Sequence, residues 1–355
     1  MTTSLASETP VSIPRHDFRT MLDFSRSVFA LKDNPAYLRL LEACLPETAK
    51  IKTQWPSVLM GFDFHLTADG PKLIEINNNA GGLYIGDERW LPQPAMTELS
   101  GSLEMRLTKM FHGDWATIAI MDEDVTNQFM YPEMQAYAGL FEQDGRHVVV
   151  VSPEDIQLHS DGLYVKDVKI DAIYNRHTDF YLETADVAHV RTAYERGQVV
   201  LNPHPRSYAL IGDKSRMVDW WREGLLEQCT AADTVERIRA VTPQTVQLAE
   251  IDPEQVWRDR KHWVFKPSAR HGGKGVVLGK GISRVRFEAL DREETIVQQL
   301  VPASMVEVEG KQMKLDIRLY MHGEKLIALA GRVWNGQVTN FREPGSGWVA
   351  LNIEG

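Results

Sequence analysis

Residues 72–77, Lys-Leu-Ile-Glu-Ile-Asn, form a short acidic segment with the pattern of a β-strand. A second such segment, Gly-Phe-Asp-Phe, lies upstream at 61–64, and the stretch Thr-Ala-Asp-Gly-Pro at 67–71 has the composition of a hairpin turn. In an antiparallel pair of strands, Asp63 and Glu75 lie on one face. The sequence therefore predicts a β-hairpin that carries two carboxylates on the same side.

A third polar group joins these carboxylates, because Asn77 follows Glu75 by two residues and faces the same way. We expect the three groups to converge without a Lys or Arg partner, which is costly because like charges repel. A hard divalent cation removes that cost, and Mg²⁺ prefers oxygen ligands of this kind. The pattern favours Asp63, Glu75 and Asn77 as ligands of Mg²⁺, with Mn²⁺ as the alternative ion. The simpler interpretation is a solvated hairpin with ordinary surface acids.

The overall composition limits the class of protein. A chain of 355 residues with 43% hydrophobic and 25% charged residues is typical of a soluble globular protein with two or more domains. The formal charge of −10 argues against a general nucleic-acid or anionic-membrane surface. No apolar run approaches the roughly 20 residues of a membrane helix. The two cysteines, Cys44 and Cys229, favour a reducing cytoplasm.

Four regions follow one another along the chain. Small and polar residues predict a disordered tail over 1–14. Residues 15–112 begin with a helical pattern and hold the hairpin. Residues 113–205 alternate strand, helix and strand patterns and predict a small α/β domain. Residues 206–355 have a mostly antiparallel α+β pattern. The expected fold class is α+β with an α/β accessory domain.

A glycine-rich loop at 266–277 has the composition of a polyphosphate site. Gly272 and Gly273 let the backbone approach an anion closely, and the loop carries three cations, Lys266, Arg270 and Lys274. It differs from the Walker pattern, because no glycine lies at the required spacing before Gly273 and a strand-like segment follows instead of a helix. The simpler interpretation is a glycine-rich turn with surface lysines.

A later strand carries charged side chains at alternating positions. Lys314, Asp316 and Arg318 share one face of this strand, and three polar residues follow in the segment after it: Arg332, Asn340 and Arg342. Such a face is often merely solvated.

Taken in order, these motifs resemble the ATP-grasp fold, and within it the bacterial glutathione synthetases. The resemblance rests on Asp213-Lys214, Phe265-Lys266-Pro267 with its loop, 297–302, Asp316-Ile317-Arg318, and 331–340. The hairpin 61–77 resembles the metal-binding segment of the same family, which usually comes after the other motifs. Here it comes first, which resembles the circularly permuted group that includes glutathionylspermidine-synthase-like proteins. We therefore interpret 15–112 as the permuted C-terminal portion, 113–205 as a pre-ATP-grasp-like domain and 206–355 as the nucleotide-binding lobe with the central sheet.

The resemblance also implies roles for individual residues. Lys214 and Lys266 resemble the two lysines on the nucleotide phosphates, beside the loop residues. The segment between the lobes, which meets adenine, corresponds to Gln298, Gln299, Leu300 and Val301, although the family often has an acidic residue there. Glu307 or Glu309 would reach the ribose. Arg332 resembles the arginine that stabilises developing charge, Asn340 resembles a polar substrate or phosphate contact, and Arg318 could take either role. Arg176 is a candidate carboxylate clamp, and Asn79 and Arg342 are expected to line the substrate pocket.

The activity that the resemblance implies is an ATP- and Mg²⁺-dependent ligation of a carboxylate to an amine through an acyl phosphate. The substrates are expected to be a small acid, such as an amino acid or short peptide, and an amine. A phosphotransferase or carboxylase-type enzyme on the same fold is the alternative, with His271 as the nearest phosphoryl acceptor. A non-catalytic nucleotide-binding module is a third interpretation. The residues leave open whether the protein is a homodimer.

Overall fold

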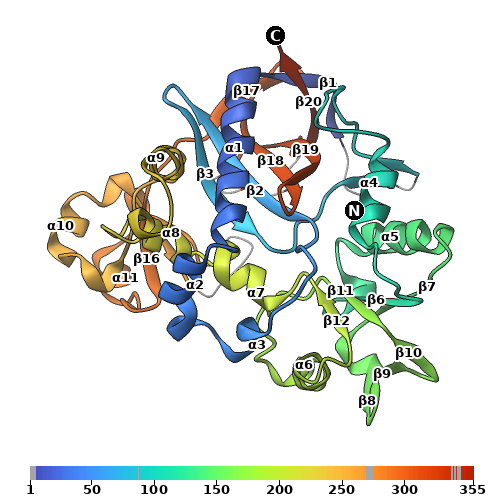
Figure 1. The fold of residues 1–355 in the computed structure, drawn as a ribbon. Helices are drawn as coiled ribbons and strands as arrows, with labels where there is room; N and C mark the ends of the chain where they lie inside the picture. Colours follow the sequence, from blue (N-terminus) through green and yellow to red (C-terminus); the bar gives the residue numbers. More distant parts are fainter. Residues whose placement is uncertain (1–4, 87, 269–274, 337–338, 340, 342–344) are drawn as a thin grey trace.

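The computed structural model describes residues 5–86, 88–268, 275–336, 339, 341 and 345–355. Its largest sheet contains, in chain order, β1 (Leu5–Pro14), β2 (Met60–Thr67), β3 (Gly70–Asn77), β17 (Ser304–Val308), β18 (Lys311–His322), β19 (Lys325–Trp334) and β20 (Gly347–Glu354). The spatial order is β1-β20-β19-β18-β2-β3, and β17 pairs with the same edge of β18 as β2 does (Figure 1). All pairs are antiparallel except β1 with β20. The hairpin β2–β3 thus extends a sheet whose other strands lie mainly at the far end of the chain.

The alternation of residues in β2 separates the two faces of this sheet. Phe62 and Phe64 point to the face covered by helix α1 (Arg15–Leu31), where Phe24 meets their rings edge-on with centroids 6.5 and 5.9 Å apart. Asp63, between them, therefore points to the opposite face. The burial of the two phenylalanines fixes the register, because a shift by one residue would place the carboxylate in the apolar core.

A second, parallel sheet has the order β12-β11-β6-β7 and lies at the lower right of Figure 1. Its elements are β6 (Thr117–Met121), α5 (Tyr131–Gln143), β7 (His147–Val151), β11 (Ala172–Asn175), α6 (Ala188–Glu195) and β12 (Val200–Asn202), with the small antiparallel sheet of β8 (Ile156–His159), β9 (Gly162–Val165) and β10 (Val168–Ile170) beside it. Tyr137 and Tyr174 of this domain share one apolar cluster with Tyr320 and Trp348 of the large sheet. The accessory domain is therefore packed onto the large sheet.

A third, antiparallel sheet forms the lobe at the left of Figure 1, in the order β13-β16-β14-β15. Its elements are α8 (Ser215–Trp221), α9 (Ala232–Val241), β13 (Thr245–Gln247), α10 (Pro253–Arg258), β14 (Trp263–Pro267), β15 (Val277–Leu278), α11 (Arg284–Glu288) and β16 (Thr295–Gln299). The lobe has its own small core around Phe265, Phe287 and Val297. The remaining helices and strands are α2 (Pro35–Leu41), α3 (Glu47–Lys50), β4 (Tyr84–Gly86), β5 (Arg89–Trp90), α4 (Leu103–Met110) and α7 (Pro205–Ser207).

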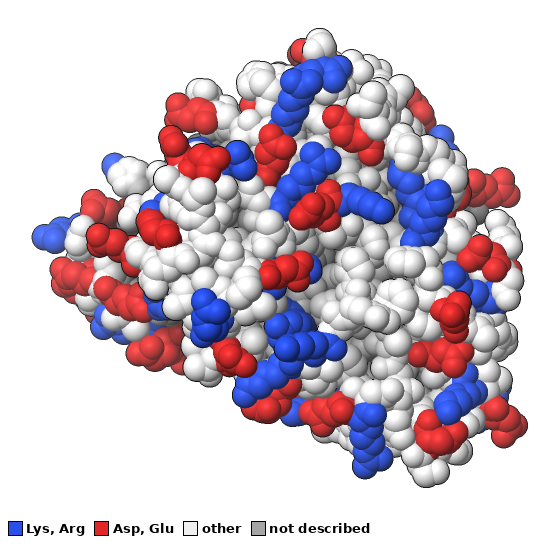
Figure 2. Space-filling view, in the orientation of Figure 1, with Lys and Arg blue, Asp and Glu red and all other residues white. Residues whose placement is uncertain are grey.

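The structure confirms the α+β class with an α/β accessory domain and corrects one boundary. Residues 5–14 of the expected disordered tail form β1, whose partner β20 lies at the other end of the chain, so local composition gave no sign of it. Within 206–355, residues 245–299 form the lobe sheet, whereas the strands from 304 onward join the hairpin in the large sheet. Lys and Arg are interspersed with Asp and Glu over the face shown in Figure 2. Within the described ranges, no helix is long and apolar enough to span a bilayer.

Candidate functional site

The polar residues of the hairpin align with an arginine of the next strand. In the register of β2, Asp63 lies opposite Glu75 of β3 on one side and Arg318 of β18 on the other. Nε and Nη2 of Arg318 donate to the two carboxylate oxygens of Asp63, each at 2.6 Å. The three side chains therefore form a row across three strands, on the face opposite α1.

A second arginine, Arg332 of β19, links Asp63 to Asp316. Its Nη2 lies 2.7 Å from Oδ2 of Asp63, and its Nε lies 2.6 Å from Oδ1 of Asp316. Asp63 is fully buried, and Asp316, Arg318 and Arg332 are at most 9% exposed. Buried charges are stable only when they are paired and hydrogen-bonded, so these two carboxylates and two guanidinium groups form one mutually dependent network.

The expectation that Asp63 has no arginine partner is therefore wrong. Its two partners lie 255 and 269 positions away, so nothing within the hairpin reveals them. Burial alone would raise the pKa of Asp63, but Arg318 and Arg332 hold that pKa below its usual value. For Asp316, burial raises the pKa, because Arg332 offsets only part of the desolvation.

Glu75 and Asn77 stay half-buried and are less engaged than Asp63. Nδ2 of Asn77 donates to Asp63 at 3.0 Å and to Oε1 of Glu75 at 3.3 Å. Oδ1 of Asn77 and Oε2 of Glu75 accept no hydrogen bond from any described residue, whereas Oδ2 of Asp63 already accepts three. The described residues contain no group of three His, Cys, Asp or Glu suited to a metal ion. Glu75 and Asn77 therefore fit a cation that takes its other ligands from phosphates and water, as Mg²⁺ often does.

Lys266 reaches the hairpin from the lobe. Its Nζ lies 2.9 Å from the carbonyl oxygen of Ile74 in β3 and 2.6 Å from Oε1 of Gln298. Burial, together with the charge of Lys214 and against the attraction of Glu75, lowers the pKa of Lys266 to about 8. The structure thus brings together Lys266, Lys214 and the acidic hairpin, which lie far apart in the sequence.

Lys214 itself is buried directly before helix α8. The preceding Asp213 accepts the backbone N–H of Ser215 at 2.9 Å and the hydroxyl of Tyr181 at 2.7 Å. Asp213 thus ties the first turn of α8 to the accessory domain and fixes where Lys214 enters the site.

The predicted segment between the lobes is held by contacts that leave part of it free for a ligand. The Gln298 side chain donates to the hydroxyl of Thr245 at 3.1 Å and accepts a hydrogen bond from Lys266. The backbone N–H of Leu300 donates to the carbonyl oxygen of His262 at 2.7 Å. The backbone N–H of Gln299 is likewise bonded, to Gln244. Any adenine contact would therefore use the remaining carbonyl groups and the N–H of Val301.

His65 is a residue that the sequence pattern did not single out. It lies on β2, stacks on Trp334 with ring centroids 6.1 Å apart, and has Nδ1 3.2 Å from the carbonyl oxygen of Val301. Burial lowers the pKa of His65 to about 4, so the ring is neutral at pH 7. It joins the segment between the lobes to strand β2 of the large sheet.

Arg176, the expected carboxylate clamp, is engaged with a carboxylate of the chain itself. Its Nη2 lies 3.2 Å from Oε2 of Glu133, and both side chains are almost fully buried. Oε1 of Glu133 accepts the backbone N–H groups of three successive residues, Gly82, Leu83 and Tyr84. Asn79 donates to the carbonyl oxygen of Arg176. The pair therefore fastens the segment after the hairpin to the accessory domain, and the role of Glu133 had no local signal in the sequence.

A cleft of about 990 Å³ separates the accessory domain from the lobe. Ser268, which leads into the glycine-rich loop, and Tyr208 both line it. Burial, with the charges of Asp213 and Glu75, raises the pKa of Tyr208. None of the described lining residues is Lys or Arg, and nine are acids: Glu123, Asp124, Glu154, Asp179, Glu183, Asp186, Asp213, Glu293 and Glu294.

Glu307 and Glu309, the candidates for the ribose contact, are not part of this assembly. Glu307 is exposed on β17 and lines a separate cavity beside β1, where Glu309 accepts the hydroxyl of Ser7 at 2.6 Å. Six predicted site residues and the candidate phosphoryl acceptor lie outside the described residues: Arg270, His271, Gly272, Gly273, Lys274, Asn340 and Arg342.

Comparison with known proteins gives matches among solved structures. No family model and no curated protein matches the sequence. A glutathione synthetase-like effector from Globodera pallida aligns with 99% of this chain and 90% of its own, at 12% identity and a TM-score of 0.62. A putative γ-glutamylcysteine synthetase from Methylobacillus flagellatus aligns with 95% of this chain and 85% of its own, at 11% identity and a TM-score of 0.53. Circular permutation stays a prediction. At these identities the likeness concerns the fold, and it confirms the predicted one: the chain has the ATP-grasp-like fold of glutathione synthetase-like proteins.

Proposed function

We propose that the protein is an ATP-dependent ligase that joins a small carboxylic acid to an amine. The observation that carries the proposal is the meeting of Glu75, Asn77 and Lys266 beside the paired arginines of the large sheet. A magnesium nucleotide needs oxygen ligands for its metal ion, which carboxylate and amide groups supply. It also needs cations beside its phosphates, which a lysine and guanidinium groups supply. Both cysteines are free, which agrees with a reducing, cytoplasmic setting.

Glu75 and Asn77 would hold the Mg²⁺ ion, with Mn²⁺ as the alternative, because each has an oxygen without a hydrogen bond from the described residues. When bound, the ion supplies positive charge to the β- and γ-phosphates of ATP. Asp63, which the sequence predicted as a metal ligand, would instead orient Arg318 and Arg332, whose positive charges balance its carboxylate.

The two arginines have different capacities to contact a substrate. Every guanidinium nitrogen of Arg318 is hydrogen-bonded, to Asp63 or to the carbonyl oxygen of Gly81. Nη1 of Arg332 has no hydrogen bond to a described residue, although Nε and Nη2 are fixed by Asp316 and Asp63. Arg332 is therefore the better candidate to donate to the transferring phosphoryl group, and Arg318 positions the site.

In the proposed reaction, an oxygen of the acid attacks the γ-phosphorus of ATP, ADP leaves, and an acyl phosphate forms. The amine then attacks the carbonyl carbon, loses a proton, and releases inorganic phosphate as the amide forms. No side chain of the protein acts as a nucleophile, so positioning and charge stabilisation carry the catalysis. The acidic cleft favours entry of an amine in its ammonium form.

The proposal can be tested by measuring ADP release with panels of amino acids, short peptides and amines, with hydroxylamine as a trap for the acyl phosphate. We expect wild-type protein to yield a hydroxamate in the presence of the correct acid. Glu75→Gln should abolish ADP release while the unfolding temperature stays unchanged, and Glu236→Gln, at an exposed helix position, should behave like wild type. Full Mg²⁺-dependent activity of Glu75→Gln would refute the assignment of the metal ligand. ADP release without hydroxamate would favour the phosphotransferase.

A further inference from the structure

Five arginines are buried in the described part of the chain, and only one of them lacks a carboxylate partner. The other four form ion pairs: Arg176 with Glu133, Arg216 with Asp219, Arg318 with Asp63, and Arg332 with both Asp63 and Asp316. Arg106, on helix α4, is 8% exposed and has no ion pair with a described residue. A buried cation without an anion is costly, so this exception needs a physical reason.

The guanidinium of Arg106 is held by two backbone carbonyl groups. Nε donates to Ile327 of β19 at 2.7 Å, and Nη1 donates to Gly101 at 2.6 Å. Nη2 is shielded from water and has no hydrogen-bond partner among the described residues. The carbonyl groups fix the position of the side chain but bring no formal negative charge, and the carboxylate of Glu104 attracts Arg106 without forming an ion pair with it.

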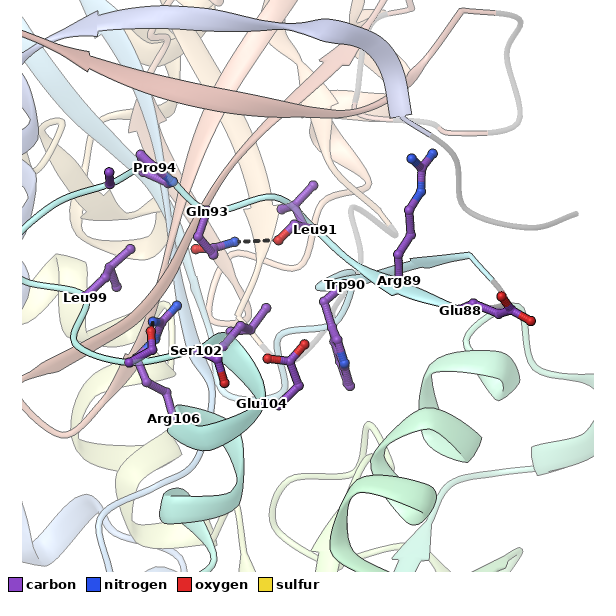
Figure 3. Close-up of a pocket in the computed structure, with 13 residues that line it drawn as sticks. Glu88, Arg89, Trp90, Leu91, Gln93, Pro94, Leu99, Ser102, Glu104 and Arg106 are labelled. Carbon is purple, nitrogen blue, oxygen red and sulfur yellow. Dashed lines mark hydrogen bonds between the residues drawn. The ribbon is translucent and has the colours of Figure 1, made fainter. Parts of the chain in front are cut away.

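Arg106 lines a cavity of about 540 Å³ that shares no residue with the proposed ligase site (Figure 3). The first turn of α4 forms one wall, where the Ser102 side chain accepts the N–H of Met105 and the earlier N–H groups have no partner within the helix. A helix N-terminus attracts anions. The positive end of α4 and the buried guanidinium therefore act on the same space.

The rest of the wall offers charged groups, Glu88, Arg89 and Glu104, and apolar surface. Glu104 is half-buried, and Figure 3 shows its carboxylate on the same side of α4 as Trp90. Trp90, Leu91 and Leu99 supply the apolar part of the lining. A ligand matched to this cavity has an anionic group, a cationic group and a short apolar portion.

We propose that this cavity binds a small amino carboxylate, in the manner of a free amino acid. The carboxylate faces Arg106 and the first turn of α4, the ammonium group faces Glu104, and the side chain packs against Trp90 and Leu99. The bound carboxylate gives Arg106 the ion pair that the described residues do not supply, which explains why an arginine is buried there. The site is independent of the proposed ligase activity.

The proposal predicts that Arg106 serves binding and not stability. Without its ligand the buried charge is a cost, so Arg106→Met should unfold at or above the wild-type temperature. By contrast, Arg216→Met removes a paired cation and should unfold at a lower temperature.

Calorimetric titration of the full chain with glycine, L-leucine and acetate tests the site. Wild type should bind L-leucine more tightly than acetate, Arg106→Met should weaken L-leucine binding at least tenfold, and the exposed control Arg286→Met should not change it. Glu104→Gln should weaken L-leucine but not acetate, and this surface change keeps the test decisive if Arg106→Met fails to fold. The proposal is overturned if none of the three probes binds wild type, or if Arg106→Met or Glu104→Gln binds L-leucine as wild type does.

Discussion

The substitution Asp63→Asn tests whether Asp63 holds the two buried arginines in place, as opposed to acting only as a metal ligand. Asparagine keeps the size of the side chain but removes the charge that two buried arginines share. Arg332 would retain Asp316, whereas Arg318 would retain only neutral acceptors, the new amide oxygen and the carbonyl oxygen of Gly81. The substitution therefore leaves one buried guanidinium without a carboxylate.

The loss of stability expected for Asp63→Asn follows from the one guanidinium group that is left without a carboxylate. Removing one partner of a buried ion pair costs about 3–5 kcal/mol, and the lower end applies because Arg332 keeps a partner. An unfolding entropy of about 2.1 cal/mol/K per residue gives roughly 0.75 kcal/mol/K for the 355 residues. The unfolding temperature should thus fall by about 4 °C if the chain unfolds in one step, and by more if the large sheet unfolds separately.

Differential scanning calorimetry of wild type, Asp63→Asn and Glu75→Gln gives the comparison. Only Asp63→Asn should shift the transition, because the partly exposed Glu75 has no arginine partner among the described residues. The pKa of Asp63 lies below its usual value, so its stabilisation is present above the usual carboxyl range and is lost as the pH falls through the lowered pKa. The gap between wild type and Asp63→Asn should therefore close in strong acid. Equal transitions at pH 7 would refute the reasoning.

Two further substitutions probe the rest of the site. The pKa of Lys266 is lowered to about 8, so its ammonium deprotonates as the pH rises through that value, and the wild-type KM for ATP should rise between pH 7 and 9 in steady-state assays. Lys266→Met should raise that KM by about 10- to 100-fold at pH 7, because a charge-assisted hydrogen bond of about 1.5–3 kcal/mol is lost. The KM of this variant should not depend on pH over the same range. A KM for ATP that is unaltered by Lys266→Met would show that Lys266 does not bind the phosphates. Glu133→Gln keeps an acceptor for the backbone of Gly82 but removes the partner of Arg176, so it should lower the unfolding free energy by about 3 kcal/mol in thermal or denaturant unfolding. An unchanged unfolding midpoint would mean that this pair does not fasten the segment after the hairpin to the accessory domain.

The parts of the molecule that could be predicted from the sequence are those encoded by local patterns. The alternation around Glu75 and the turn at 67–71 are sufficient for the hairpin, because period-two patterning and turn composition are local properties. The strand–helix–strand pattern of the accessory domain is equally local. The position of Lys266 beside β3 was expected only from the order of motifs, since no local pattern reports contacts across 192 positions.

The parts that could not be predicted depend on pairing between distant segments. The tail at 1–14 has few apolar residues, and β1 exists because β20 provides a parallel partner. Arg176 looked like a free clamp for a substrate because its partner, Glu133, lies 43 positions away on a helix. A charged residue near a site is therefore mistaken for a ligand-binding residue when the side chain that pairs with it lies far away in the sequence.

The same logic distinguishes the residues that build this site from those that act in it. Asp63 and Arg318 bond each other, Asp316 is bonded by Arg332, and groups so engaged hold their neighbours in place. Glu75 and Arg332 each keep an atom without a described partner, on the face of the sheet that Lys266 approaches. Residual capacity beside a saturated, rigid network is what a preorganised site requires, since the network fixes where the unused atoms point before any substrate arrives.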